Sequence, residues 1–188
     1  DAAYFDEKTA VALRANDRRI IEEGERIEVE ETNVDRRTGE SRSYLSIKLP
    51  LRREDGSIYA LCGISTDISE RKRAEEQLRM LSTAVEQSPG SIVLTDLDAR
   101  ILYVNKAFEQ ASGYTLDEVR GENPRIMHSG ETPPEVFREL WDCLSQGQVW
   151  RGELVNRRKT GEVYVEAAII SPVRQADGSV SHYLGIKQ

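Results

Sequence analysis

Alternating apolar residues and helical spacings predict a chain of short strands and helices in its second half. The stretches 91–96 and 101–105 are short, rich in β-branched and apolar residues, and separated by the turn "LDAR", which predicts a hairpin-like pair of strands. Two short helical pieces follow at 106–114 and 115–121, and Thr115 is a suitable N-cap for the second.

An amphipathic helix and three more strands complete this half. In "TPPEVFRELWDCLSQG" the apolar residues Val136, Leu140 and Cys143 recur at helical spacing, so a helix is predicted to end at Gly147. Helices placed inside an antiparallel meander indicate an α+β domain with a five-stranded antiparallel sheet and short helices on one face. The three strands are predicted at 149–157, 162–171 and 180–187.

The chain contains an internal repeat. "RRTGE" at 36–40 matches "RKTGE" at 158–162, and "LPLRREDGSIYALCGI" at 49–64 matches "SPVRQADGSVSHYLGI" at 171–186, so the second copy lies 122 residues after the first (158 against 36). Shared turn residues with alternating apolar positions indicate two copies of one structural unit. The first copy lacks the counterpart of about forty residues that open the second. Either the sequence begins inside a domain, which we favour, or the first copy is incomplete and needs another chain.

A charged segment, "ISERKRAEEQLRMLSTAVEQ", joins the copies. Ala74, Leu78, Leu81 and Val85 recur at spacings of 4, 3 and 4, which predicts a helix with a narrow apolar stripe. The stripe has two interpretations: it packs on one of the domains, or it pairs with the same helix of a second copy as a parallel coiled coil. We favour the homodimer, because the stripe is narrow and charges of both signs flank it.

Composition excludes several classes of function. The net charge of −7 argues against a nucleic-acid partner, and no apolar run approaches the roughly 20 residues that span a bilayer, so a cytoplasmic protein without a membrane segment is expected. Cys62 and Cys143 form no disulfide framework or metal-ligand pattern, and two histidines, His128 and His182, provide no metal cluster. No phosphate-binding glycine loop or catalytic set is found, so an enzyme is not expected.

Two motifs show a resemblance to PAS sensor domains. "GISTDISERKRAEEQLR" resembles the end of such a domain, where an acidic position, here Asp67, precedes a signalling helix; "ILYVNKAFEQASGYTLDEVRG" resembles the opening of one. The resemblance implies the C-terminal part of a first PAS domain over 1–69, a linker helix over 70–86 and a complete second PAS domain over 87–188.

Within that family, "GENPRIMHSG" (121–130) and "LVNRRKTGEVYVEAAIISPV" (154–173) are most similar to the flavin-binding branch. This branch includes the light-sensing LOV domains and the redox sensors that regulate nitrogen fixation and methane oxidation. Pro124 stands where LOV domains carry their reactive cysteine, so light-driven thiol chemistry is excluded at that position. Cys143 lies on a different predicted helix. Trp141 and the run "WRGELVNRR" (150–158) are similar to the redox sensors of nitrogen fixation, so the resemblance favours a redox sensor.

The resemblance implies these cofactor-binding residues: Asn123, Arg125, Trp141, Asn156 and Glu166. The Asn156 amide offers a donor and an acceptor to the edge of an isoalloxazine ring, Arg125 suits a phosphate, and Trp141 suits an adenine. Each also has a structural interpretation. Asn123 would cap a turn, Arg125 would form a surface ion pair, Trp141 would be a core residue, and Asn156 would satisfy backbone groups at a bulge.

Glu166 projects from a central strand, and if it faces inward it needs a partner such as Lys187 or a ligand N–H. The apolar walls of the pocket are predicted to be Ile92, Leu94, Val104, Leu140, Leu154 and Ile169.

We therefore expect a sensory module of a bacterial signalling protein that binds a flavin, FAD or FMN, in its second domain. Its redox state would pass through the linker helix to an output domain outside this chain. The first copy, with a strongly charged strand region, is expected to bind no cofactor. The alternative is a cofactor-free PAS scaffold that dimerises and relays signals.

Overall fold

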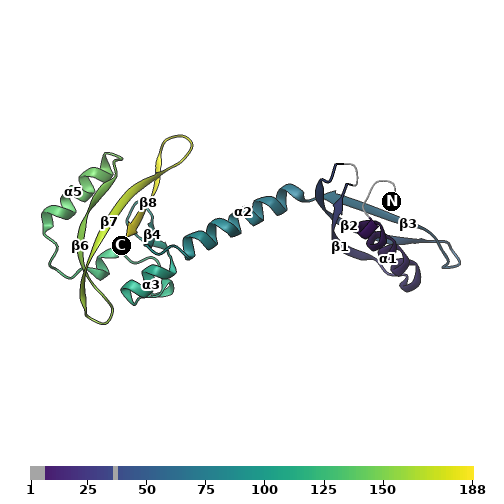
Figure 1. Ribbon diagram of the computed structural model, residues 1–188, viewed down its shortest axis with the longest axis horizontal. Coiled ribbons are helices and arrows are strands. Elements are labelled where there is room, and N and C mark those ends of the chain that lie inside the picture. Colours follow the sequence, from purple (N-terminus) through teal and green to yellow (C-terminus); the bar gives the residue numbers. More distant parts are fainter. Residues whose placement is uncertain (1–6, 36–37) are drawn as a thin grey trace. The chain divides into compact units, whose positions relative to one another are not determined.

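The computed structural model describes residues 7–35 and 38–188, which divide into two compact units, one ending at Arg79 and the other beginning at Met80 (Figure 1). Helix α2 (Ser69–Glu86), the helix predicted between the two copies, contains this boundary. No helix among the described residues is both long and apolar enough to cross a membrane.

The first unit is a three-stranded antiparallel sheet in the order β1-β2-β3, with one helix packed on all three strands. Its side chains Ala10 and Ile20 on the helix are fully buried, as expected where an apolar stripe meets a sheet. The elements are α1 (Glu7–Glu23), β1 (Ile27–Val34), β2 (Ser41–Arg52) and β3 (Ile58–Asp67). The helix α1 was not anticipated from the sequence.

The second unit confirms the predicted α+β fold. Its five antiparallel strands follow the order β5-β4-β8-β7-β6, with helices packed against the sheet. The elements are β4 (Ser91–Thr95), β5 (Ile101–Val104), α3 (Lys106–Ser112), α4 (Leu116–Val119), the 3-10 helix η1 (Pro124–Met127), α5 (Pro134–Ser145), β6 (Trp150–Arg157), β7 (Val163–Arg174) and β8 (Val180–Lys187).

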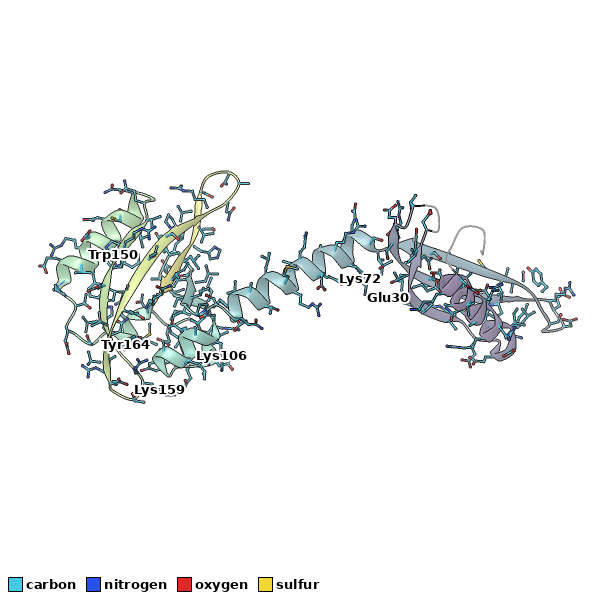
Figure 2. The ribbon with its side chains drawn as sticks, in the orientation of Figure 1. Glu30, Lys72, Lys106, Trp150, Lys159 and Tyr164 are labelled. Carbon is cyan, nitrogen blue, oxygen red and sulfur yellow. The ribbon has the colours of Figure 1, made fainter. Side chains whose placement is uncertain are left out.

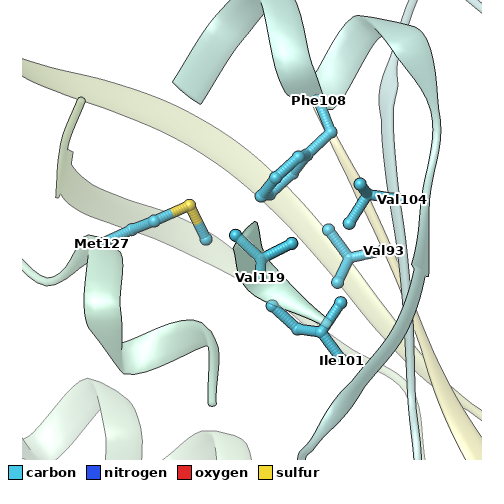
Figure 3. Close-up of a cluster of buried hydrophobic side chains, with 6 residues drawn as sticks. All are labelled: Val93, Ile101, Val104, Phe108, Val119 and Met127. Atoms are coloured by element: carbon cyan, nitrogen blue, oxygen red, sulfur yellow. The ribbon is translucent and has the colours of Figure 1, made fainter. Parts of the chain in front are cut away.

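Two buried clusters hold the helices of this unit to its sheet. One lies where α3, α4 and η1 meet β4 and β5 (Figure 3) and consists of Val93, Ile101, Val104, Phe108, Val119 and Met127. The other lies under α5 and consists of Leu140, Leu144, Trp150, Leu154 and Ala168. Val104, predicted as a pocket wall, belongs instead to the first cluster.

Asn105 joins three segments of the second unit. Its side chain is fully buried, and its Oδ1 accepts hydrogen bonds from the backbone N–H groups of Ile92 (2.9 Å) and Phe108 (3.1 Å). Its Nδ2 donates to the carbonyl groups of Gly90 (3.0 Å) and Val85 (3.1 Å). One amide thus caps α3, fixes the start of β4 and holds the end of α2.

The beginning of α2 is fixed in a similar way by the acidic motif at the end of β3. Asp67 Oδ1 accepts a hydrogen bond from Ser69 N (2.8 Å), and Ser69 Oγ accepts one from Ser43 N on β2 (2.9 Å). The hydrogen bonds from Ser69, with a contribution from Arg42, hold the pKa of the Asp67 carboxyl below its ordinary value. The motif "TDIS" therefore ties the helix to the sheet that precedes it.

The internal repeat recurs in the hydrogen bonding of the two units. Arg174 donates from Nη1 to the carbonyl of Gly178 in the β7–β8 hairpin (2.9 Å) and from Nη2 to that of Gly147, just after α5 (3.0 Å). Arg52, 122 positions earlier, makes the same two bonds in the first unit. Its acceptors are the carbonyl groups of Gly56 and Gly24. A matched pattern of turns and helix ends thus produces matched structure.

Candidate functional site

A cavity of about 380 Å³ lies in the second unit. Its lining comes from η1 and the residues beside it, from α5, and from the strands of the sheet, and most of the lining is apolar. The lining residues with polar side-chain atoms include Thr95, Asn123, Arg125, His128, Asn156 and Lys187. An apolar slot with a few polar groups is the usual form of a small-molecule site, and its volume lies within the roughly 300–1,000 Å³ typical of such sites.

The polar groups on the sheet meet at one corner, where β6, β7 and β8 run side by side. Glu166 Oε1 accepts hydrogen bonds from Asn156 Nδ2 (2.5 Å) and Lys187 Nζ (2.6 Å). All three residues are buried, with 3% of Asn156, 5% of Glu166 and 6% of Lys187 exposed. Asn156 and Lys187 line the cavity, whereas Glu166 lies behind them. Glu166 therefore faces inward and has the partner that its burial requires.

A short connection between η1 and α5 is fastened to β6 beside this corner. Ser129 Oγ donates to the carbonyl of Val155 (2.5 Å), and Val155 N donates to Thr132 Oγ1 (2.8 Å). His128 forms an isolated backbone bridge with Asn156. These bonds fix the polar corner relative to η1, so that residues far apart in the sequence face one cavity.

The proline in "GENPRIMHSG" begins η1. Asn123 caps this helix, because its Oδ1 accepts a hydrogen bond from Arg125 N (3.1 Å), and Pro124 occupies the first turn, where its missing N–H and fixed φ are tolerated. Both Asn123 and Pro124 line the cavity. The capping function predicted as the structural alternative for Asn123 is therefore present, and its Nδ2 makes no hydrogen bond with the residues that the structure describes.

His128 is stacked on Phe137 of α5, with ring centroids 4.4 Å apart, at the edge of the cavity. Partial burial, followed by the positive charges of Arg125 and Lys187, lowers the pKa of the imidazole from its ordinary value. The neutral ring is thus favoured near neutral pH, and it can accept or donate a hydrogen bond.

The two tryptophans lie in different surroundings, and of the two interpretations of Trp141 the structural one, a core residue, is wrong. Trp141 is not a core residue, since 45% of it is exposed; it lines the cavity and meets the Tyr183 ring edge-on at 6.0 Å. Trp150, labelled in Figure 2, is buried, and its Nε1–H has no acceptor among the described residues. The Trp150 indole lies over Gly152, where any side chain would collide with it.

The five residues implied by the resemblance thus fall into two groups. Asn123, Arg125, Trp141 and Asn156 line one cavity, and Glu166 supports it from behind. Arg125 is exposed at this cavity and forms no ion pair with the described residues, so its predicted surface ion pair is absent there.

The predicted apolar walls were partly wrong. Leu140 and Leu154 line the cavity, but Ile92, Leu94 and Ile169 do not. Ile92 and Ile169 both pair with Ile186 on β8, and Leu94 lies two residues after Ile92 on β4. Because side chains alternate along a strand, Ile92, Leu94 and Ile169 lie on the face of the sheet opposite the cavity. Phe137 and Tyr183, two aromatic walls of the cavity, were not predicted as part of it.

Comparison with protein families agrees with this fold. A family model described as PAS fold matches residues 79–188, more than half of the chain. The chain belongs to the PAS family. A second model, also described as PAS fold, matches residues 1–73.

Named relatives match about half of the chain. A nitrogen fixation regulatory protein of Klebsiella oxytoca is 42% identical over 106 residues, which are 56% of this chain and 21% of that protein. The aerotaxis receptor of Escherichia coli (strain K12) is 37% identical over 94 residues, which are 50% of this chain and 18% of the receptor. The PAS chain thus spans about a fifth of the length of these relatives, which are a regulatory protein and a receptor.

Solved structures resemble it as well. A light-oxygen-voltage domain studied with a flavin analogue is 29% identical, with a TM-score of 0.52 over 60% of this chain and 83% of that one. The LOV domain of a blue-light activated histidine kinase from Erythrobacter litoralis EL346 is 26% identical, with a TM-score of 0.51 over 54% and 96%.

Proposed function

We propose that this PAS chain is a sensory module of a signalling protein and that its second unit binds a flavin, FAD or FMN, whose redox state it reports. The observation that carries the proposal is the apolar cavity with one buried polar corner, formed by Asn156, Lys187 and Glu166. A planar aromatic ring with one hydrogen-bonding edge matches this arrangement. The named relatives, a regulatory protein and a receptor, and the LOV domain studied with a flavin analogue support it.

The residues present fit such a ring. Asn156 uses its Nδ2 on Glu166, so its Oδ1 is left as an acceptor, and the Lys187 ammonium keeps further N–H donors after bonding Glu166. These two groups would hold the polar edge. Apolar side chains such as Leu140 and Leu154 would pack on the ring, and Arg125 and Trp141 would meet the rest of the molecule. A bound flavin would supply reversible two-electron reduction.

Redox sensing is favoured over light sensing because of Pro124. This residue lines the cavity in place of a cysteine, and neither Cys62 nor Cys143 is among the lining residues. Without a thiol at the ring, a covalent thiol adduct cannot form.

The signal would leave the cavity through the sheet and α2. Lys187 pairs with Ser91 at the start of β4, and this strand follows α2 in the chain. On α2, Leu78 and Leu81 of the apolar stripe are 68% and 63% exposed. We propose that this apolar stripe pairs with the same helix of a second copy, because such a pair would bury it, and that an output domain outside this chain reads the arrangement of the helices.

The test is the absorption spectrum of the purified chain, before and after addition of FAD or FMN and then of dithionite. Flavin bands that are bleached by the reductant and restored by air, with no light-induced adduct, support the proposal. Asn156→Ala removes about one hydrogen bond to the ring and should weaken binding roughly two- to tenfold (~0.5–1.5 kcal/mol). Trp141→Ala should also weaken it, whereas Asn33→Ala, in the first unit, should not.

Two results would contradict the proposal. If the chain takes up neither flavin, even after refolding with an excess, it is a cofactor-free relay scaffold. If flavin binds but Asn156→Ala binds it as tightly as the unchanged chain, the ring lies elsewhere.

A further inference from the structure

A buried ion pair borders the cavity at the end of β8. Lys187 and Glu166 have 7% and 6% of their side chains exposed, and no other ion pair among the residues that the structure describes has both partners so deeply buried. Both hydrogen bonds to the Glu166 carboxylate, from Lys187 and from Asn156, go to one oxygen, Oε1.

Packing of the core does not require this pair. Removing two charges from water is costly, and replacing a buried ion pair with apolar residues of similar volume is often neutral or stabilising. The two partners also differ in where they lie, because Lys187 lines the cavity and Glu166 does not. A ligand in the cavity therefore meets the positive end of the pair, and the negative end lies behind it.

We propose that Lys187 sets the reduction potential of the bound flavin and that Glu166 limits the effect of its charge. This rests on the flavin binding proposed above. Reduction by two electrons from an external low-potential donor, with uptake of one proton from water, adds one net negative charge to the ring. An ammonium group at the cavity wall stabilises that charge relative to the neutral oxidised ring, and a carboxylate behind it has the opposite effect.

The experiment measures the midpoint potential of the flavin in the full chain at one fixed pH. Lys187→Met keeps the length of the side chain and removes its charge. It should reduce the preference of the site for the reduced over the oxidised ring by about tenfold. For a two-electron couple this lowers the midpoint potential by about 30 mV. Glu166→Gln keeps the shape of the carboxylate and should raise the potential. Lys187→Arg retains the charge and should leave the potential close to its original value.

A matched control is Lys106→Met. Lys106 is an exposed lysine of α3 that pairs with Glu109 (Figure 2) and does not line the cavity. Its substitution removes the same charge and should not move the potential. A purely structural role for the buried pair would instead make Lys187→Met and Glu166→Gln behave alike.

The outcomes separate the two proposals. Opposite shifts for Lys187→Met and Glu166→Gln support the assignment, and a shift for Lys187→Met no larger than that of Lys106→Met overturns it. If Lys187→Met fails to hold flavin, Glu166→Gln decides: a raised potential supports the assignment, and an unchanged or lowered one overturns it. If the unchanged chain takes up no flavin, the absorption spectrum shows this directly, and the flavin-binding proposal itself fails.

Discussion

The amide of Asn105 gives the strongest prediction for the stability of the second unit. Asn105→Ala removes both atoms that hold β4, α3 and the end of α2 together. The backbone N–H groups of Ile92 and Phe108 lose their acceptor, and the carbonyl groups of Val85 and Gly90 lose a donor. The site is fully buried, so water replaces these partners only if the structure opens.

The expected cost follows from these four groups. A buried polar group left without its partner costs about 1–3 kcal/mol, and carbonyl groups tolerate this better than N–H groups do. The two N–H groups then contribute about 3 kcal/mol and the two carbonyl groups about 1 kcal/mol, so the free energy of unfolding should fall by about 4 kcal/mol. Typical domains have about 5–15 kcal/mol in total, so the variant should be close to unfolding.

Tryptophan fluorescence during urea unfolding measures this loss selectively. The chain has two tryptophans, Trp141 and Trp150, and both lie in the second unit. The control is Asn123→Ala, which removes one capping hydrogen bond to Arg125 N and should cost about 1 kcal/mol. A loss for Asn105→Ala no larger than that of the control would refute the reasoning, because it would mean that the buried groups find other partners at little cost.

Two further predictions concern Gly152 and the tyrosines Tyr164 and Tyr103. A methyl group at Gly152 would lie 2.3 Å from Cζ2 of Trp150. Gly152→Ala should therefore displace the indole, change its fluorescence emission and destabilise the unit by about 1–3 kcal/mol. Unchanged emission and stability would mean that the ring rotates freely. Burial, with the nearby charge of Glu166, raises the pKa of Tyr164 to about 12, and burial with Glu86 does the same for Tyr103. The pKa values of both phenols are higher in the folded than in the unfolded chain. Their contribution to the free energy of unfolding is therefore complete below the unfolded pKa of about 10 and is lost as the pH rises towards 12. Phenolate absorbance should show the phenol of Tyr164 titrating near 12 and, in Glu166→Gln, at lower pH; no change in that variant would contradict the assigned cause.

Much of the fold was predictable because it rests on local signals. The amphipathic spacing of α5, the "DGS" and "KTG" turns and the alternation along β6, β7 and β8 each depend on residues close in sequence. The internal repeat also predicted that parts of the two units have the same local structure, because equal turns at equal spacing fold alike.

The site was less predictable because it depends on which face of the sheet is covered. The strand β4 has apolar residues at both alternating positions, so its pattern could not show that Val93 faces the cavity while Ile92 and Leu94 face away. Lys187 was named as a partner for Glu166 on the condition that Glu166 faces inward, and that condition is decided by the pairing of β7 with β8 rather than by the local pattern. In the same way, the "N-x-AF" motif marks Asn105, but the position of its amide between β4, α3 and the end of α2 is visible only in three dimensions.

The paired bonds of Arg174 have a consequence for amide hydrogen exchange. A single guanidinium bonds both the β7–β8 hairpin and Gly147, just after α5, so opening of the hairpin weakens the hold on the end of the helix. The amides of these two segments should therefore exchange with solvent as one cooperative unit, with a common opening free energy. Arg52 couples the β2–β3 hairpin to the end of α1 in the same manner, so each unit has its own cooperative opening at this point.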